Sequence, residues 1–126
     1  MVKKNACVFI SGKGTNLRNL IIQSREYNFP INIKLVISNN KNAYGITHAK
    51  KNSIPYLIVD TKKRYFEYDL LKILKENKIS LICLAGYMRI LSKKFIESYT
   101  KKIINIHPSL LPKYKGLDTF KRILTN

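Results

Sequence analysis

The sequence predicts an α/β fold with a mainly parallel β-sheet. Five short apolar runs alternate with segments whose apolar residues recur at helical spacing. Strands that alternate with helices form right-handed βαβ units, and such units build parallel sheets. A glycine-rich turn also follows the first apolar run and opens a helix. The chain has 126 residues, which suits one core, so we expect residues 1–126 to form a single domain.

The first half of the chain contains three predicted strands. Residues 6–10 are apolar with β-branched and aromatic members, and they end at a glycine-rich turn, 11–16. Leu17, Leu20 and Ile21 then follow at helical spacing. Residues 32–38 form the second predicted strand, 39–42 a turn, 43–52 a helix and 56–59 the third strand.

The second half continues the alternation. Residues 65–77 carry Leu70, Leu71 and Leu74 on one helical face, and 80–85 is a continuous apolar strand. Ser92 has the chemistry of an N-cap for a short helix that ends near residue 99. Residues 102–106 form the fifth predicted strand. Prolines and a glycine make 107–116 a loop, and 118–124 is predicted to start another helix.

The composition excludes several classes of protein. Hydrophobic residues make up 45% of the chain, and no apolar run approaches the roughly 20 residues that span a bilayer. The first apolar stretch is too short for a signal peptide, so we expect a cytoplasmic protein. Cys7 and Cys83 lie in strand-like segments. We therefore expect two buried reduced thiols, with neither a disulfide nor a metal site.

The charge leaves two interpretations open. Lys and Arg number 24 against 7 Asp and Glu, a net charge of +17, which by itself favours nucleic acid or an anionic surface as a partner. However, the lysines occur as scattered pairs, and the chain is also rich in Ile and Asn. That pattern favours a compositional bias over a nucleic-acid or membrane partner, and nucleic-acid binding remains the alternative.

Segments that follow the strands carry the candidate chemistry, because ligands of parallel sheets bind beyond the carboxyl ends of the strands. Residues 11–16 read Ser-Gly-Lys-Gly-Thr-Asn before a helix. Glycines permit close approach to backbone N–H groups, and a helix N-terminus favours a phosphate. The spacing matches neither a Walker loop nor the full dinucleotide fingerprint. The alternative is a tight turn required only for packing.

Asn105 and His107 form the second candidate. Residues two apart on an extended segment point to the same side, and Pro108 stiffens the chain after them. An amide donor beside an imidazole suits the oxyanion of an acyl transfer. The alternative is a structural histidine in a turn. The other histidine, His48, lies among lysines in a predicted helix and is expected to be a surface residue.

The third candidate, residues 86–91, combines a glycine, an arginine and apolar side chains. Such a segment suits a flat heterocycle read by backbone hydrogen bonds, although an ordinary strand-to-helix loop has the same composition.

Together, three motifs resemble one family. They are residues 10–17 (ISGKGTNL), 84–91 (LAGYMRIL) and 105–116 (NIHPSLLPKYKG). In this order they are similar to the phosphoribosylglycinamide formyltransferases, folate-dependent enzymes of purine synthesis. Methionyl-tRNA formyltransferase shares a similar third motif and is an alternative. The resemblance implies a Rossmann-like three-layer formyltransferase fold with a mainly parallel sheet.

The resemblance also implies a role for each site. The enzyme would transfer a formyl group from 10-formyltetrahydrofolate to the amine of glycinamide ribonucleotide, without a metal, and would act on this small molecule as a monomer or homodimer. The ribose phosphate would bind at Gly14, Thr15 and Asn16. The folate would bind at Met88, Arg89, Ile90 and Leu91, with Arg64 as the nearest match to a folate-contacting arginine of the family. The catalytic residues would be Asn105 and His107.

The family continues beyond the third motif with further strands and an aspartate that orients the histidine. The sequence stops at Asn126, and neither Asp60 nor Asp118 matches the motif of that aspartate. We therefore expect a fold whose C-terminal strands are missing. A remnant that binds phosphate or nucleotide without catalysis is a further alternative.

Overall fold

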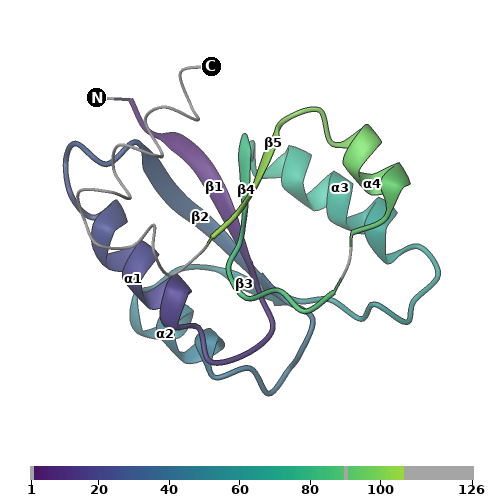
Figure 1. Cartoon of the computed structure of the whole chain (residues 1–126), viewed down its shortest axis with the longest axis horizontal. Helices are drawn as coiled ribbons and strands as arrows, with labels where there is room; N and C mark the ends of the chain where they lie inside the picture. The colour runs from purple at the N-terminus through teal and green to yellow at the C-terminus, as the bar shows by residue number, and fades with distance from the viewer. Residues whose placement is uncertain (1, 90, 107–126) are drawn as a thin grey trace.

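The computed structural model describes residues 2–89 and 91–106. Nine helices and strands alternate within this part of the chain, as the sequence predicts (Figure 1). They are β1 (Lys4–Ile10), α1 (Thr15–Ser24), β2 (Ile31–Ser38), α2 (Gly45–Lys51), β3 (Tyr56–Ile58), α3 (Phe66–Glu76), β4 (Leu81–Leu84), α4 (Lys93–Ser98) and β5 (Lys102–Asn105).

All five strands form one sheet in the order β3-β2-β1-β4-β5, and every pairing is parallel. The chain runs outward from β1 to β2 and β3, then crosses back to build β4 and β5 on the other side of β1. The direction of winding therefore reverses between β1 and β4. In open parallel sheets this switch point is where loops diverge and leave a crevice for a ligand.

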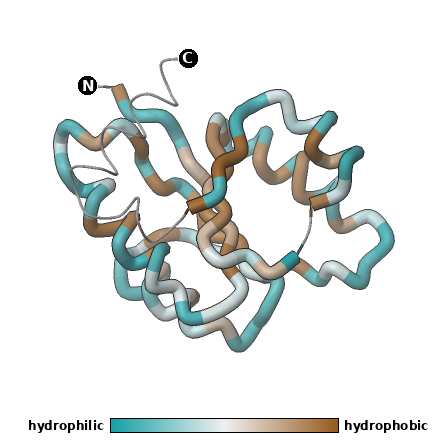
Figure 2. The backbone as a smooth tube through the Cα atoms, viewed as in Figure 1, coloured by the Kyte–Doolittle hydropathy of each residue, from teal (hydrophilic) through white to brown (hydrophobic). Residues whose placement is uncertain are grey.

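Helices cover both faces of the sheet and give three layers (Figure 1). On one face, Leu17 and Leu20 of α1 pack with Ile46 and Ala49 of α2 in an apolar cluster. On the other face, a second cluster is formed with residues of α3 and α4, namely Leu70, Leu74 and Phe95. Hydrophobic residues accordingly concentrate along the strands between the helices (Figure 2).

Burial on both faces explains why the central strand reads as an uninterrupted apolar run. Every residue from Ala6 to Ile10 is fully buried, as expected for a parallel strand covered on two sides. β3 lies at the sheet edge and has only three residues. Leu57 and Ile58 are 39% and 46% exposed there. The strand ends at Ile58, one residue before the predicted end at residue 59.

Helix ends agree with the local chemistry. The hydroxyl of Ser92 accepts a hydrogen bond from the Phe95 N–H at 3.0 Å, which confirms the predicted N-cap of α4. α2 is shorter than predicted and ends at Lys51, with Asn52 as its C-cap, followed by Ser53 with a positive φ of 56°. The predicted loop 107–116 and helix 118–124 lie outside the described residues.

The two cysteines are free and buried, as predicted. Their side chains belong to different apolar clusters, Cys83 to that of α1 and α2, and Cys7 to that of α3 and α4. Burial raises the pKa of the Cys83 thiol to about 12, and burial, with a smaller effect of Cys83, raises the pKa of Cys7. Both thiols are therefore protonated at neutral pH and pack as small apolar groups.

Among the helices that the structure describes, none has the length and apolar character required to cross a bilayer.

Candidate active site

The three strands that precede candidate residues, β1, β4 and β5, have their carboxyl ends side by side. Phe9 of β1 is level with Leu84 of β4, and Leu84 is level with Asn105 of β5. Backbone hydrogen bonds extend this alignment, because Ala85 N–H donates to Phe9 O and Ile106 N–H donates to Leu84 O, both at 2.9 Å. The sheet thus brings together the described starts of three motifs that are separate in the sequence.

The turn after β1 presents a helix N-terminus. Gly14 is the N-cap of α1 and adopts the left-handed conformation, with φ 77° and ψ 22°. Glycine has no side chain to cap the helix, and the first turn contains no acidic residue. The first N–H groups of a helix have no carbonyl partner within the helix, and they carry the positive end of the helix dipole. This end of α1 is therefore suited to an anion such as a phosphate.

Packing also requires glycine in this turn. A β-carbon added to Gly14 would lie 2.4 Å from the Cα of Gly45, and one added to Gly45 would lie 2.7 Å from Ile10 Cδ1. The Gly45 N–H donates to Gly12 O at 3.0 Å. The start of α2 therefore holds the turn from behind. The packing explanation and the anion-binding explanation are both compatible with this geometry, because the contact with α2 fixes the N–H groups of the turn.

A cavity of about 320 Å³ lies between this turn and the end of β4. It is lined by Gly12, Lys13, Gly14, Thr15, Asn16, Asn19, Ala85 and Gly86. The cavity occupies the switch point of the sheet and combines a helix N-terminus, a lysine and two asparagines. These groups offer hydrogen-bond donors and positive charge to a phosphate ester.

Ser11 connects the loops around this cavity. Its buried hydroxyl donates to Asn39 Oδ1 at 2.5 Å and accepts a hydrogen bond from the Met88 N–H at 2.7 Å. Asn40 Nδ2 also donates to the Ser11 carbonyl oxygen at 3.2 Å. The loops after β1, β2 and β4 are therefore joined at one side chain. Ser11 belongs to the predicted turn, but no local signal in the sequence indicates this connection, because its partners are 28 and 77 residues away.

The loop after β4 divides its side chains between the core and the solvent. Tyr87 packs edge-on against Phe9, with ring centroids 5.3 Å apart. Met88 is 82% exposed, whereas Leu91 is 9% exposed and belongs to the apolar cluster of α3 and α4. Ile90 lies outside the described residues. Among the described residues of this loop, the exposed Met88 offers an apolar side chain to a ligand.

The loop is also attached to the start of α3. Glu67 accepts hydrogen bonds from the Ser92 hydroxyl at 2.5 Å and from the Ser92 N–H at 3.1 Å. The guanidinium of Arg89 lies over the ring of Phe66, 5.8 Å from its centroid. These contacts fix the end of the loop against a helix.

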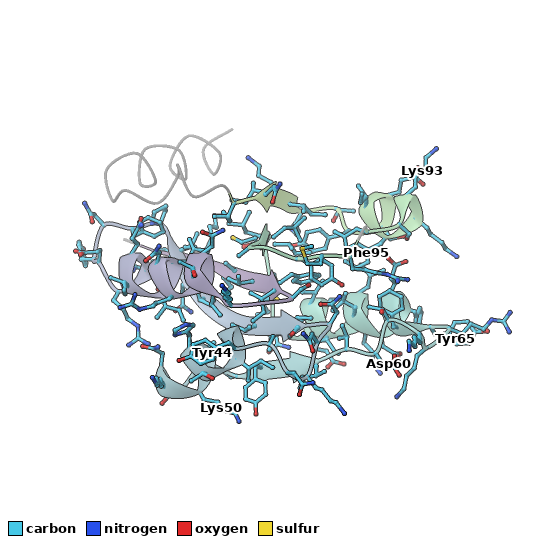
Figure 3. The ribbon with its side chains drawn as sticks, turned by 60° about the horizontal axis from the view of Figure 1, so that its bottom comes forward. Tyr44, Lys50, Asp60, Tyr65, Lys93 and Phe95 are labelled. Atoms are coloured by element: carbon cyan, nitrogen blue, oxygen red, sulfur yellow. The ribbon has the colours of Figure 1, made fainter. Side chains whose placement is uncertain are left out.

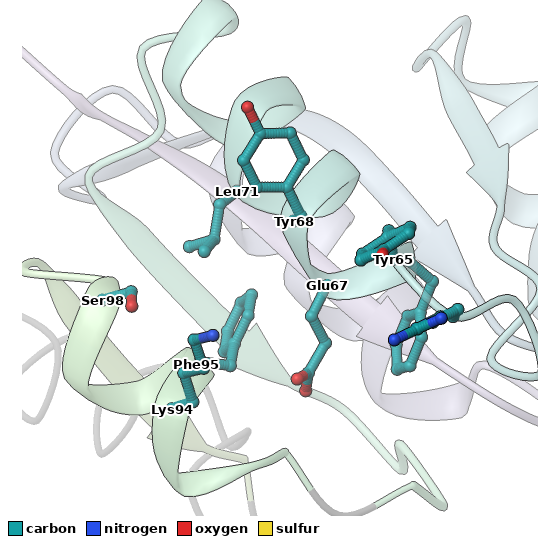
Figure 4. A pocket seen from close by; sticks show the side chains of 9 residues that line it. Tyr65, Glu67, Tyr68, Leu71, Lys94, Phe95 and Ser98 are labelled. Atoms are coloured by element: carbon teal, nitrogen blue, oxygen red, sulfur yellow. The ribbon is translucent and has the colours of Figure 1, made fainter.

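Arg64, the weakest of the predicted site residues, is exposed just before α3 and lies 5.4 Å over the ring of Tyr65. It lines a groove between α3 and α4 whose other lining residues include Glu67, Tyr68, Leu71 and Phe95 (Figure 4). Phe66 lines the same groove and contacts Arg89. Arg64 and Arg89 therefore lie over the neighbouring rings of Tyr65 and Phe66 at the start of α3.

Asn105 ends β5 and is exposed. It does not line the cavity of the turn, since β4 lies between β5 and β1 and two strand spacings amount to about 10 Å. His107 follows immediately outside the described residues. The prediction that Asn105 and His107 point to the same side thus remains a prediction, while the alignment of Asn105 with the ends of β4 and β1 is observed.

Comparison with known proteins identifies relatives over nearly the whole chain. The sequence model of the family described as formyl transferase matches residues 4–126. The chain belongs to this family. The three motifs therefore come from formyl transferase ancestry, and the predicted family and Rossmann-like α/β fold are confirmed.

The chain is similar to phosphoribosylglycinamide formyltransferase from Haemophilus influenzae, with 43% identity over 96% of this chain and 59% of the relative. It is also 40% identical to the human trifunctional purine biosynthetic protein adenosine-3, over 97% of this chain and 12% of that protein. The chain therefore spans about three fifths of the length of the Haemophilus relative.

Solved structures show the same similarity. Phosphoribosylglycinamide formyltransferase from Brucella melitensis matches with a TM-score of 0.79 and 39% identity, over 98% of this chain and 66% of that chain. The Coxiella burnetii enzyme of the same name matches with a TM-score of 0.73 and 43% identity, over 98% of this chain and 60% of that chain.

Proposed function

We propose that this protein transfers the formyl group of 10-formyltetrahydrofolate to the amine of glycinamide ribonucleotide, a reaction of purine synthesis. The observation that carries the proposal is that the glycine turn, the loop after β4 and Asn105 are aligned at the carboxyl ends of β1, β4 and β5. The chain that carries them belongs to the formyl transferase family. We expect the reaction to use free small molecules in the cytoplasm, without a metal.

The ribose phosphate of the substrate would bind at Gly14, Thr15 and Asn16. These residues line the cavity at the N-terminus of α1, where unpaired N–H groups and the helix dipole favour a dianion. Gly45 behind the turn and Asn39 beside it restrict its movement. The phosphate would thus anchor the substrate while its amine reaches the formyl carbon.

The folate would bind along the loop after β4. Met88 offers an exposed apolar side chain, and Arg89 next to it offers a positive charge over the ring of Phe66. Arg64 offers a second positive charge at the groove that Phe66 also lines. Ile90 and Leu91 complete the motif, with the Leu91 side chain directed into the core. The bond from the Met88 N–H to Ser11 sets the position of this loop relative to the phosphate turn.

In the proposed reaction, the amine of the substrate attacks the formyl carbon and the carbonyl oxygen becomes an oxyanion. The Asn105 amide and the protonated imidazole of His107 would donate hydrogen bonds to that oxygen. The collapse of the tetrahedral intermediate breaks the bond to the folate nitrogen. That nitrogen takes up a proton, and the amine loses one, directly or through water.

Asp60 lies far from the end of β5, the strand that His107 follows in the sequence. It follows β3, at the opposite edge of the sheet from β5, and four strand spacings amount to about 19 Å. Its carboxylate instead accepts a hydrogen bond from the Lys62 N–H at 3.0 Å. We therefore assign Asp60 to the turn after β3.

Formation of formylated glycinamide ribonucleotide, followed by mass spectrometry, tests the proposal. Binding of each substrate is measured separately by calorimetry. We expect Asn105→Ala to lower kcat by about 10²–10³-fold with little change in the dissociation constant of the ribonucleotide. Asn32→Ala, an exposed asparagine at the start of β2, is the matched control. His107→Ala should abolish transfer and leave ribonucleotide binding nearly intact.

The outcomes separate three cases. Binding of both substrates without any product would identify a binding remnant and reject the proposed activity. Product formation at the wild-type rate by Asn105→Ala or His107→Ala would reject the assignment of that residue. Formylation of a methionyl-tRNA in place of the ribonucleotide would assign the chain to the related enzyme.

A further inference from the structure

A second cavity lies on the other side of the glycine turn, between the turn and the helices α1 and α2. We refer to it as the α1–α2 cavity. Its volume is about 660 Å³, within the range of small-molecule sites. It is lined by Lys13, Thr15, Arg18, Tyr44, His48 and Lys51. Lys13 and Thr15 also line the cavity at the end of β4, so the two cavities adjoin at the turn.

The lining of the α1–α2 cavity is strongly basic. Lys13, Arg18 and Lys51 contribute three full positive charges, and none of its lining residues is acidic. Within the described part of the chain, these three side chains make neither an ion pair nor a side-chain hydrogen bond. Like charges that converge without a counter-ion raise the local potential, and an anion lowers it.

His48 forms the inner wall. A β-carbon added to Gly14 would lie 3.3 Å from His48 Cδ2, which places the imidazole directly behind the phosphate turn. The ring of Tyr44 meets it edge-on, with centroids 5.5 Å apart. Partial burial, followed by the charges of Arg18 and Lys51, lowers the pKa of His48. The cations around His48 thus disfavour another positive charge in the cavity.

Tyr44 extends the cavity with an aromatic surface. Its side chain is 59% exposed, and it lies on the α2 side of the molecule, away from Lys93 and Phe95 (Figure 3). An exposed ring beside a group of cations matches a ligand that has a flat base and phosphates, because aromatic rings stack on bases and cations bind phosphate.

We propose that the α1–α2 cavity binds the phosphates of a free nucleotide, at a second anion site distinct from the one that the helix N-terminus provides. Arg18 and Lys51 contact the phosphates, and Tyr44 contacts the base. The volume of about 660 Å³ suits a small ligand. The site adjoins the phosphate turn through Lys13 and Thr15, so a bound nucleotide is placed to influence the occupancy of that turn.

Calorimetry with ATP at about 0.15 M salt tests the proposal. We expect the double variant Arg18→Ala/Lys51→Ala to weaken ATP binding about tenfold or more, because charged hydrogen bonds to phosphate are lost. The matched control, Lys72→Ala/Lys75→Ala, removes the same charge from exposed positions on α3 and should change the affinity less than about twofold. Tyr44→Ala should weaken binding of ATP but not of inorganic pyrophosphate.

The titration of His48, followed by NMR, gives a second readout. Bound ATP should raise the pKa of His48 in the wild type, because the phosphates offset Arg18 and Lys51. In the double variant the pKa should be higher before ATP is added and should respond less. These effects do not depend on formyl transfer, so they are measurable even if the proposed reaction fails.

Four results would overturn the proposal. They are the absence of ATP binding by the wild type, equal weakening in the control variant, loss of glycinamide ribonucleotide binding together with ATP binding in the double variant, and binding of single-stranded RNA that ATP does not displace. The third result would make the cavity part of the substrate site, and the fourth would make it part of a nucleic-acid surface.

Discussion

The Ser11 hydroxyl is the contact on which the arrangement of the site loops most depends, and Ser11→Ala removes it. The hydroxyl is buried and forms one hydrogen bond with Asn39 and one with the Met88 N–H, at 2.5 and 2.7 Å. A hydrogen bond contributes about 0.5–1.5 kcal/mol net. Only the bond with the Met88 N–H joins the loop after β4, so Ser11→Ala should weaken the attachment of that loop by about 0.5–1.5 kcal/mol, a factor of about 2–12 in its opening equilibrium.

Native-state hydrogen exchange at the Met88 amide measures this opening directly. We expect exchange at Met88 to accelerate by about 2–12-fold in Ser11→Ala. The Ala85 amide, which donates to Phe9 O within the sheet, serves as the internal reference and should change little. Ser24→Ala removes a hydroxyl that bonds to a carbonyl near the end of α1, and is the control for loss of a serine elsewhere.

The same variant has a consequence for ligands. If the loop after β4 binds folate, its looser attachment should raise the folate dissociation constant and leave ribonucleotide binding largely unchanged. An unchanged Met88 exchange rate would contradict the reasoning outright, whatever the ligands do. Faster exchange with unchanged folate affinity would show that the loop is attached as described but does not bind folate.

Two further contacts of the fold and the burial of the thiols give additional predictions. Gly45→Ala should destabilise the protein by about 1–3 kcal/mol, because the new methyl would lie 2.7 Å from a buried side chain of β1; a thermal melt measures this, and Gly12→Ala, with open space around it, should be nearly neutral. Cys7 and Cys83 should not react with a thiol reagent at pH 8 until denaturant is added, because burial raises both pKa values; rapid labelling of the native protein would contradict this. Ser92→Ala should reduce stability by about 1 kcal/mol through loss of the α4 cap, and an unchanged denaturation midpoint would show that the cap contributes nothing.

Local signals in the sequence predicted the elements accurately. The alternation of apolar runs and helical spacing gave all five strands, with ends within two residues of those observed. Ser92 could be recognised as a cap because capping depends on residues three positions apart. The glycine turn could be recognised for the same reason, since the properties of Gly14 and the helix after it are local.

Contacts between segments far apart in the sequence could not be predicted from such local signals. Asn39 and Asn40 appeared only as a turn, yet both bond to Ser11. His48 appeared to be an isolated surface histidine, whereas the fold places it behind Gly14 and between Arg18 and Lys51. Leu91 appeared to be a candidate lining residue of a ligand site, whereas its side chain packs in the core.

The sequence alone determined which residues form strands, helices and caps, and through its three motifs the family to which the chain belongs, because these depend on neighbours along the chain. The tertiary structure decided the order of the strands, and with it which loops meet. Parallel pairing is set by packing between segments far apart in the sequence. Only the placement of β1 beside β4 brings the phosphate turn to the loop after β4, and only the packing of α1 against α2 gathers the cations behind it.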